Sequence, residues 1–490
     1  MTQRVVLAVD EGTTNSKAVL VAQDGSIIAT GSAAVDIHHP QSGWVEQDAV
    51  QIWKSTTGAI AACISEAGDV EIVALGLSNQ RESILLWDRT TGSPIGPVVT
   101  WQCRRTASAC EELKAAGHET DVIARTGLPI DPLFPATKIA WLLQEHGSGI
   151  PPENICIGTV DAWLIWNFSG GVVHATDRSN AARTQLFNLA DLQWDSHLCA
   201  LFNVPSGMLP DVRDSSSLFG TTKDVEGLPD GIPIGSAIGD SHGALFGHGA
   251  FQPGDGKITF GTGSSVMATI AEFIEPPGGV TTTIAWSLEG TPTYAFEGNI
   301  LVSASILPWT ADLLGLSGVD ALLELAQSVE SSLGVQLVPA HVGLGSPHWN
   351  SAARGLISGL SFGSGPAHVA RAATESIALQ VRDVFEILEP NFDNGIGRLH
   401  VDGGPSGNSF LMSMVADYLD HPIITEEATE ASALGAAYLA GLTVGFWPNL
   451  EALFALKGKS VSIEPSMEHE TRNSRLLAWK EALNRSTLGT

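Results

Sequence analysis

The sequence predicts an α/β protein made of two similar domains, and three observations favour this fold class. A loop rich in glycine and hydroxyl side chains, at residues 10–17, directly follows the apolar run 5–9. A second such loop, at residues 261–265, follows the apolar run 258–260 in the same way. Strand-like and helix-like segments alternate on both sides of a glycine-rich stretch at residues 248–256.

The first half of the chain begins with three strands and a helix. Apolar residues in short runs between turn residues predict strands at residues 5–9, 18–21, 26–33, 71–78, 85–88 and 98–101. Helical patterns occur at residues 49–67, 106–116, 137–145 and 189–201. This mixture is typical of an α/β domain.

The second half restarts the pattern. Strands are expected at residues 257–260, 265–270, 281–286 and 398–401, and helices at residues 300–314, 320–331, 368–388 and 410–419, the first interrupted at Pro308. The uncharged stretch 431–447 is of marginal length for a membrane span, so we expect a buried helix that ends in a glycine turn. The glycine cluster divides the chain into an N-terminal domain, residues 1–250, and a C-terminal domain, residues 251–490.

Composition limits the partners. The 490 residues are 44% hydrophobic, which suffices for large cores. The net charge of −28 argues against nucleic acid or an anionic membrane as a partner, and an anionic substrate would need local cations or Mg²⁺. The five cysteines form no C-x-x-C pattern, and the first residues run directly into a strand. We therefore expect reduced thiols, no signal peptide and a cytoplasmic location.

The two glycine–hydroxyl loops favour phosphate binding. Glycine lets the backbone approach an anion closely, and hydroxyls and free N–H groups donate hydrogen bonds to it. Two such loops in matching contexts suggest two domains that close on one phosphate chain. Asp10 could then hold a metal ion or its water shell. Lys17 would either reach a phosphate or be a solvated turn lysine.

Three further segments carry candidate chemistry. Asp240, between glycines just before the boundary, could take a proton from a substrate hydroxyl, or it could cap the following helix. Arg81 and Glu82 could bind vicinal hydroxyls or form an ordinary surface pair. Trp101 could cover the apolar face of a polyol or fill a gap in the core. The loop 403–408 suits an adenine or ribose contact, although a generic strand–turn–helix looks similar.

An ordered series of segments, covering almost the whole chain, resembles the FGGY family of carbohydrate kinases and, within it, the glycerol kinases. The segments are DEGTTNSKAV from Asp10, GWVEQD from Gly43, NQRES from Asn79, TWQCRRTA from Thr100, TGLPIDPLFPATKIAWLL from Thr126, GTVDAWLIW from Gly158, TDRSNAARTQLFN from Thr176, GDSHGALFG from Gly239, FGTGSS from Phe260, ARGLISGL from Ala353, ATESIALQVRDV from Ala373, VDGGPSGNSFLM from Val401 and ALGAAYLAGLTVGFW from Ala433.

The resemblance implies two actin-like (ribonuclease H-like) domains with the active site in the cleft between them. It also implies transfer of a phosphoryl group from ATP, with Mg²⁺, to a terminal hydroxyl of a small polyol or ketose. The implied catalytic base is Asp240, and the implied Mg²⁺ neighbours are Asp10 and Asp240. The implied substrate contacts are Arg81, Glu82 and Trp101. The implied nucleotide contacts are Thr13, Thr14, Asn15, Lys17, Thr262, Gly404 and Asn408.

Three substrate positions depart from the glycerol kinase pattern. Those enzymes have Tyr at the position of Leu133, Gln at that of Ser241 and Phe at that of Ser265, so every replacement here is shorter. We therefore expect a roomier pocket, weaker glycerol binding and a substrate of four or five carbons. His242, beside the base, would either contact the far end of that substrate or lie on the helix surface.

The nucleotide pocket departs at Ala304 and Pro308, where the family has Gly and Gln, and ATP remains the expected donor. Two alternatives stay open: a true glycerol kinase that makes glycerol 3-phosphate, and an actin-fold ATPase or regulator without a sugar substrate. The retained Arg81, Glu82 and Trp101 argue against the second. Family members often form a homodimer or a homotetramer, and either state is possible here.

Overall fold

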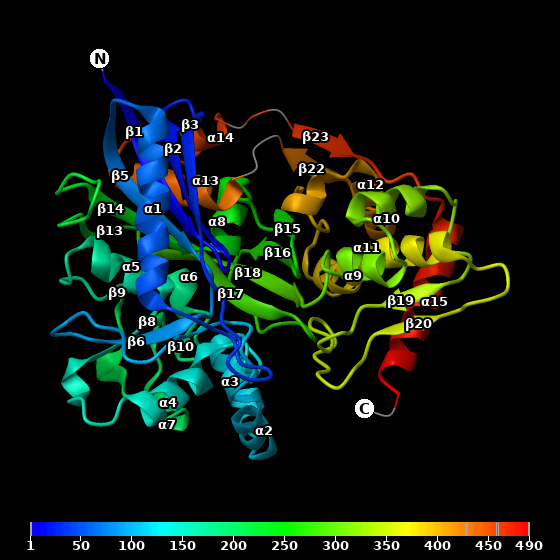
Figure 1. The fold of residues 1–490 in the computed structure, drawn as a ribbon, viewed down its shortest axis with the longest axis horizontal. Coiled ribbons are helices and arrows are strands. Elements are labelled where there is room, and N and C mark those ends of the chain that lie inside the picture. Colours follow the sequence, from blue (N-terminus) through cyan, green and yellow to red (C-terminus); the bar gives the residue numbers. More distant parts are fainter. Residues whose placement is uncertain (1, 427–429, 457, 459, 489–490) are drawn as a thin grey trace.

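The computed structural model of the chain describes residues 2–426, 430–456, 458 and 460–488. Figure 1 shows two halves side by side, with the N-terminal half in blue to green and the C-terminal half in green to red. Each half is built on a large mixed sheet. The predicted α/β class with two similar domains is confirmed, whereas the boundary at residue 250 remains a prediction.

The first sheet has the strand order β13-β14-β5-β1-β2-β3. Its strands are β1 (Gln3–Glu11), β2 (Asn15–Ala22), β3 (Ile27–Ala34), β5 (Val70–Asn79), β13 (Ser216–Thr221) and β14 (Pro233–Gly239). Helix α1 (Ala49–Ala67) packs on β2 and β3. Its first turn is capped by Asp48, whose carboxylate accepts hydrogen bonds from two backbone N–H groups.

The second sheet has the order β17-β18-β16-β15-β21-β22-β23. Its strands are β15 (Gly256–Phe260), β16 (Ser264–Ile270), β17 (Thr281–Leu288), β18 (Thr291–Ile300), β21 (Leu399–Asp402), β22 (Ile423–Glu426) and β23 (Ser460–Ile463). The long helix α11 (Pro366–Leu388) packs on this sheet and on α12 (Ser409–Leu419). Buried apolar residues from these elements make one continuous core.

The two sheets repeat one local arrangement. Strand β1 pairs antiparallel with β2 and parallel with β5, and β15 pairs antiparallel with β16 and parallel with β21. Each glycine–hydroxyl loop is therefore the turn of a hairpin, and the two turns lie at corresponding ends of the strands in the two sheets. This repetition explains why two similar loops stand about half a chain apart.

Two helices cross between the halves. Helix α8 (Asp240–Gly247) leads from β14 into the second half, and α13 (Ala431–Thr443) returns from the second half to pack on β5, β1 and β14. The helices touch at glycines: a Cβ on Gly435 would lie 1.9 Å from the carbonyl oxygen of Gly243. The predicted buried helix in the uncharged stretch is thus confirmed, and it ends at Thr443, just before Gly445.

Smaller elements complete the fold. In the N-terminal half they are β4 (Glu46–Gln47), β6 (Ile84–Asp88), β7 (Val98–Val99), β8 (Ile155–Thr159), β9 (Ala175–Asp177), β10 (Phe187–Asn188), β11 (Gln193–Trp194), β12 (Asp211–Arg213), α2 (Ala107–Ala115), α3 (Glu119–Thr126), α4 (Pro135–His146), α5 (Val160–Phe168), α6 (Arg178–Ala181) and α7 (Ser196–Leu201). In the C-terminal half they are α9 (Ile306–Leu313), α10 (Val319–Gln327), β19 (Gln336–Val338), β20 (Leu356–Ser358), α14 (Leu450–Phe454) and α15 (His469–Ser486).

Two predicted helices are wrong in part. Residues 189–201 form the end of a short hairpin and then α7, because Asn188 accepts two backbone hydrogen bonds in the turn and Asp195 caps the shorter helix. Residues 300–314 begin as the last residue of β18, and α9 starts only at Ile306. Pro308 does not interrupt this helix, since it lies in the first turn, where a missing N–H costs little.

The surface and the thiols bear on the expected partners. All five cysteines are free and buried. None of the helices in the described ranges is long and apolar enough to cross a membrane.

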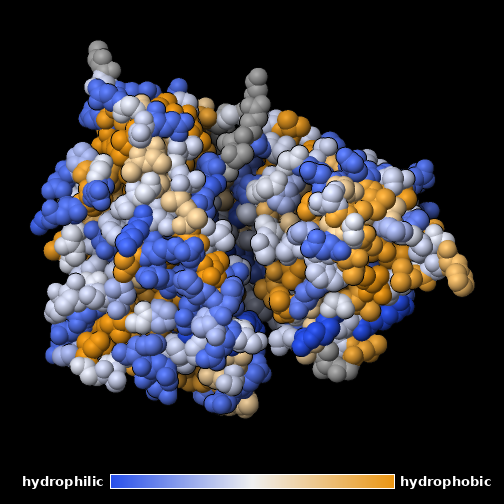
Figure 2. Space-filling view, viewed as in Figure 1, coloured by the Kyte–Doolittle hydropathy of each residue, from blue (hydrophilic) through white to orange (hydrophobic). Residues whose placement is uncertain are grey.

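Figure 2 shows hydrophobic residues over the C-terminal half, where Leu313, Val342, Leu360 and Phe362 are exposed. Exposed apolar surface of this kind is typical of association sites, but the predicted homodimer or homotetramer remains a prediction.

Candidate active site

A cavity of about 350 Å³ lies between the two halves, and both contribute its walls. From the N-terminal half the lining residues are Thr13, Thr14, Arg81, Glu82, Trp101, Gln102, Leu133, Asp240 and Ser241. From the C-terminal half they are Thr259, Gly261, Thr262, Gly263, Ser264, Ser265, Asn299, Ile300 and Leu301. The cavity therefore unites both glycine–hydroxyl turns with every predicted substrate-binding residue.

Backbone hydrogen bonds hold both turns in shape. The N–H of Gly12 donates to the carbonyl of Asn15 at 3.0 Å, and the N–H of Gly261 donates to the carbonyl of Gly263 at 2.8 Å. The residues between the bonded partners face the cavity. Thr13 and Thr14 do so from one side and Thr262 from the other.

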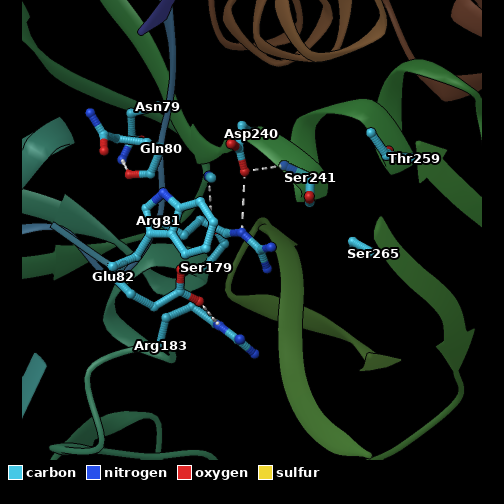
Figure 3. A network of polar contacts seen from close by, with 12 residues as sticks. Asn79, Gln80, Arg81, Glu82, Ser179, Arg183, Asp240, Ser241, Thr259 and Ser265 are labelled. Atoms are coloured by element: carbon cyan, nitrogen blue, oxygen red, sulfur yellow. Dashed lines mark hydrogen bonds and ion pairs between the residues drawn. The ribbon is translucent and has the colours of Figure 1, made fainter. Parts of the chain in front are cut away.

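Asp240 is the first residue of α8 and lies where β14 ends (Figure 3). The helix cap is the preceding residue, Gly239, so the alternative that Asp240 caps the helix is wrong. The side chain of Asp240 is 37% exposed, and Arg81 Nε lies 3.2 Å from its Oδ1. The backbone N–H of Ser241 donates to the same oxygen. The carboxylate is thus oriented by two donors and open to the cavity.

Arg81 and Glu82 are buried and do not pair with each other, so the surface-pair interpretation is wrong. Arg81 contacts Asp240 and also reaches across to the second sheet, where its Nη1 lies 2.8 Å from Oε1 of Glu297. Glu82 accepts a hydrogen bond from Arg183 Nε at 2.6 Å, as Figure 3 shows. Arg183 in turn lies 2.9 Å from the other oxygen of Glu297.

Glu297 and Arg183 were not singled out from the sequence. Each is fully buried, and they connect Arg81 to Glu82 in a chain of ion pairs that runs from Arg81 through Glu297 and Arg183 to Glu82. Although burial opposes ionisation, the guanidinium groups of Arg183 and Arg81 hold the pKa of Glu297 well below its usual value. The available signal was an acidic residue inside the apolar strand β18, which indicates a buried charge with partners.

Glu82 also has an unusual backbone. Its φ of 59° lies in the left-handed region, which side chains other than glycine rarely adopt. Such a conformation persists where surrounding contacts enforce it, and it is frequent at ligand sites. Here the ion pair with Arg183 and the parallel pairing of β5, the strand that precedes this turn, supply those contacts.

Asp10 is the residue before the last of β1, beside the first turn, and accepts a hydrogen bond from Ser78 Oγ at 2.7 Å. Burial, together with the charge of Asp240, raises the pKa of Asp10 to about 6. Two carboxylates that interact in this way form a hard oxygen donor set, which fits a divalent cation such as Mg²⁺. Lys17 points away to Glu430, with Nζ 3.0 Å from the carboxylate. It is therefore not a freely solvated lysine.

Glu11 is a further buried acid that the sequence did not single out. Burial raises the pKa of Glu11 to about 8. Nε2 of Gln80 donates a hydrogen bond to Oε2 of Glu11 at 3.2 Å. Gln80 also donates to Gln47 at 2.9 Å. A neutral carboxyl at this point avoids a second buried negative charge behind the first glycine–hydroxyl turn.

One end of the cavity has an aromatic wall. Trp101 donates through Nε1 to Thr13 Oγ1 at 2.9 Å, so its ring is held rather than loosely packed. Leu133 packs with Phe134, Trp101 and Trp349, the last from the C-terminal half. Ser265 donates to Glu297 at 2.9 Å. All three predicted departures from glycerol kinases, at Leu133, Ser241 and Ser265, therefore line one space.

Other predicted residues lie outside this cavity. Asn15, Ala304, Gly404 and Asn408 are not among its lining residues. Asn408 caps α12 by accepting from the N–H of Leu411 at 2.9 Å, and Ala304 N donates to the carbonyl of Gly261 at 3.0 Å. Gly403, with φ of 89°, lies so close to Phe260 that a Cβ would not fit. The nucleotide roles of these positions remain predictions.

His242 is wrongly placed by both sequence interpretations. It is fully buried on α8, so it is neither on the helix surface nor in the wall of the cavity. Burial, together with the charge of Arg81, lowers the pKa of His242 well below its usual value. A neutral imidazole therefore packs behind the charged network.

Known proteins match the chain over most of its length. Residues 5–247 match the N-terminal domain of the FGGY family of carbohydrate kinases, and residues 256–444 match its C-terminal domain. The chain belongs to the FGGY family of carbohydrate kinases. This FGGY kinase is thus an ATP-dependent phosphotransferase with an alcohol group as acceptor, which confirms the predicted family and enzyme class.

Individual relatives cover the whole FGGY kinase. An apulose kinase of Pectobacterium atrosepticum is 45% identical over 489 residues, covering 99% of this chain and 98% of that protein. Glycerol kinase 2 of Thermotoga maritima is 43% identical over 492 residues, covering 99% of each. The crystal structure of Plasmodium falciparum glycerol kinase with ADP superimposes with a TM-score of 0.92 at 29% identity, covering 100% of this chain and 99% of that one.

Proposed function

We propose that this kinase transfers the γ-phosphoryl group of ATP to a terminal hydroxyl of a small polyol or ketose with four or five carbons. The observation that carries the proposal is the meeting of both glycine–hydroxyl turns and the Asp240 carboxylate on one cavity. Phosphoryl transfer depends on holding the acceptor oxygen in line with the γ-phosphate and surrounding that phosphate with donors. A cavity between two halves suits both tasks.

Asp240 is the proposed general base. In this role its carboxylate accepts the proton of the substrate hydroxyl while the hydroxyl oxygen attacks phosphorus. Arg81 Nε and the N–H of Ser241 both contact Oδ1, so we assign Oδ2 to the substrate. The exposure of the side chain to the cavity supports this role.

The phosphates are proposed to lie between the two turns. Thr13, Thr14 and Thr262 offer hydroxyl and backbone donors from opposite walls, with Asn15 and Lys17 behind the first turn. Lys17 would have to leave Glu430 to reach a phosphate. Ala304, Gly404 and Asn408 are the proposed adenosine contacts, beyond the second turn.

Asp10 and Asp240 are proposed to hold Mg²⁺ or its water shell. When bound, the ion would offset the negative charge that develops on the phosphate oxygens. The raised pKa of Asp10 supports this assignment, because a cation would relieve the mutual repulsion that favours its protonated form. Ser78 keeps the carboxylate of Asp10 in place through its hydroxyl.

The proposed substrate contacts are the donors and acceptors at the aromatic end. Arg81 is held by Glu297, and Glu82 is held by Arg183. The positions of their remaining polar atoms are therefore fixed, so that they would bind two substrate hydroxyls a set distance apart. Leu133, Ser241 and Ser265 are short enough to leave space beyond a three-carbon chain. The similarity to a relative named apulose kinase supports a ketose, and the nearly equal similarity to glycerol kinases keeps glycerol as the second candidate.

A substrate screen tests the proposal. The purified kinase would be assayed by coupled ADP detection with glycerol, erythritol, erythrulose, ribulose, xylulose and apulose at equal concentrations. We expect a four- or five-carbon compound to give the highest kcat/KM. If glycerol exceeded all others, the argument from the three short side chains would be wrong. If no compound stimulated ADP release, the alternative of an ATPase without a sugar substrate would be favoured.

We also propose a cytoplasmic location and a homo-oligomeric state. The five buried free thiols support a reducing compartment, where disulfides do not persist. The exposed apolar side chains on the C-terminal half support self-association. Sedimentation of the purified chain would test the second point, and a monomer at all concentrations would exclude it.

A further inference from the structure

A second polar cluster lies outside the catalytic cavity, where the end of α8 meets β21 and β22. His248 directly follows the last residue of α8, His400 lies in β21, and Glu426 is the last residue of β22. None of the three lines the catalytic cavity. Three separate elements thus bring two imidazoles and a carboxylate to one point.

The geometry of this cluster is that of a set of ligands facing one centre. Glu426 Oε2 lies 3.1 Å from His248 Nδ1, and Glu426 Oε1 lies 2.9 Å from His400 Nδ1. The two imidazole rings are stacked, with centroids 5.1 Å apart and planes 16° from parallel. One ligand atom from each residue can be chosen so that all lie within 4.8 Å of one another.

A tetrahedral ion with bonds of about 2.0–2.1 Å separates its ligand atoms by roughly 3.3 Å. One nitrogen of each imidazole is already close to that distance from an oxygen of Glu426, although the oxygen differs between the two histidines. With one ligand atom taken from each residue, no separation exceeds 4.8 Å. Small rotations of the side chains would therefore bring the three ligand atoms around one ion.

Asp402 supplies the outer support that such a site needs. Its Oδ2 lies 2.7 Å from Nε2 of His248. An ionised carboxylate can only accept, so Nε2 donates a hydrogen bond to Asp402 and Nδ1 donates one to Glu426. Binding of an ion at Nδ1 would release the proton of that nitrogen, while Asp402 keeps the ring in place through Nε2. A carboxylate behind a metal-binding histidine is a recurrent arrangement, because it fixes the tautomer and orients the ring.

Burial adds to the case. The side chains of His248 and His400 are 1% and 3% exposed, whereas Glu426 is 18% exposed. The imidazoles are therefore shielded from bulk water, and the carboxylate marks the open side by which an ion would enter. Buried nitrogen ligands with one carboxylate suit Zn²⁺ and its neighbours in the first transition row better than Mg²⁺ or Ca²⁺.

We propose that His248, His400 and Glu426 bind one divalent transition-metal ion of the zinc class, with Asp402 as the outer partner of His248. The ion would tie the end of α8, whose first residue is Asp240, to the strand that leads into the loop 403–408. It would thus connect the helix that carries Asp240 to the second sheet. This structural role is independent of the proposed substrate and of Mg²⁺.

The test is ion binding by the full chain after treatment with a chelator. Titration with Co²⁺, followed by its visible absorption, and with Zn²⁺, followed by calorimetry, is expected to show one saturable ion per chain. His400→Gln and Glu426→Gln are expected to weaken this binding about 100-fold or more, and Asp402→Asn by about 10–100-fold. Zn²⁺ should raise the Tm of the unaltered protein and leave that of Glu426→Gln unchanged.

Two controls separate this site from others. His197→Gln removes an exposed histidine, 2.8 Å from Asp121, and should bind the ion like the unaltered protein. Asp10→Asn should also retain it, because the kinase site is separate. No saturable binding, or equal binding by Glu426→Gln, would overturn the proposal and leave the cluster as a hydrogen-bonded group. Glu426→Gln alters the most exposed member, so a folded variant is expected even if His400→Gln unfolds.

Discussion

Glu297 on the second sheet lies 2.8 Å from the guanidinium of Arg81, which follows a strand of the first sheet 216 residues earlier. The carboxylate is shared with Arg183, and all three side chains are buried. Glu297, in the C-terminal half, therefore holds Arg81 of the N-terminal half in place, and Arg81 also contacts Asp240. The halves are joined at the site itself, in addition to the crossing helices.

The first prediction concerns this shared carboxylate. Glu297→Gln leaves two buried guanidinium groups without their anion, so the free energy of unfolding should fall by about 3–5 kcal/mol. kcat/KM should fall as well, since Arg81 loses its anchor. Urea denaturation and steady-state kinetics would measure both. Glu386→Gln, which breaks partly exposed pairs with Arg382 and Lys480, is the matched control and should cost less than about 1 kcal/mol.

The second prediction concerns the proposed base. Asp240→Asn should lower kcat by about 10²–10⁴-fold, because the amide cannot take the proton of the hydroxyl. The affinity for ADP, measured by calorimetry without the acceptor, should change much less. Asp121→Asn, at an exposed ion pair with Arg125 on the same half, should keep nearly full activity. A kcat within tenfold of the unaltered enzyme would remove Asp240 from this role.

The third prediction concerns substrate size. Replacing Leu133 by Tyr and Ser241 by Gln should shrink the cavity and add hydrogen-bonding groups for a short polyol. The ratio of kcat/KM for glycerol to that for the preferred longer substrate should rise roughly 10-fold or more, since such contacts contribute about 1–3 kcal/mol. Leu477→Tyr, on the exposed face of α15, controls for the added ring. An unchanged ratio would contradict the assignment of these two positions.

The fourth prediction concerns pH. Burial, together with the charge of Asp177, raises the pKa of Asp161 to about 7. Above its ordinary pKa near 4, the unfolded chain binds fewer protons at this position than the folded one. The folded state therefore loses stability as pH rises from about 4 to 7.

Asp161→Asn removes that dependence. The Tm of the variant relative to the unaltered protein should increase steadily between pH 5 and about 7 and then level off. Differential scanning calorimetry at several pH values would measure it. Glu153→Gln, at an exposed position, should change the Tm by the same amount at every pH. If the Tm of Asp161→Asn and that of the unaltered protein changed with pH in parallel, the carboxyl of Asp161 would not titrate in that range.

The fifth prediction concerns the crossing helices. Gly435→Ala places a methyl group 1.9 Å from a backbone oxygen of α8, so the helices must move apart. We expect a loss of about 1–3 kcal/mol or more in stability and a clear fall in activity, because α8 carries Asp240. Gly207→Ala has nothing within 4 Å of the new methyl group and should be close to neutral. Thermal melts and kinetics of the pair would separate the two cases.

The sequence predicted much of the fold because its strongest signals are local. Helix α1 was predicted at its observed bounds, since Asp48 and the apolar spacing mark it within one segment. Local patterns also marked Thr13, Thr262 and Asp240, which lie beside glycines and line the cavity, whereas their roles remain predictions. Glu297 and Arg183 were missed, because their meaning depends on partners that only the fold brings together. The hairpin at residues 187–194 was missed because the side chain of Asn188 competes with helix formation.

The return of α13 to the first sheet has a consequence for dissecting this protein. Val6, Ala8, Val19 and Ala74 pack under α13, although that helix belongs to the last quarter of the chain. A fragment cut at residue 250 would carry a bare apolar sheet face into water and would tend to aggregate. Fusions, split reporters and truncations should therefore leave both chain ends intact and place any insertion at an exposed turn of the C-terminal half.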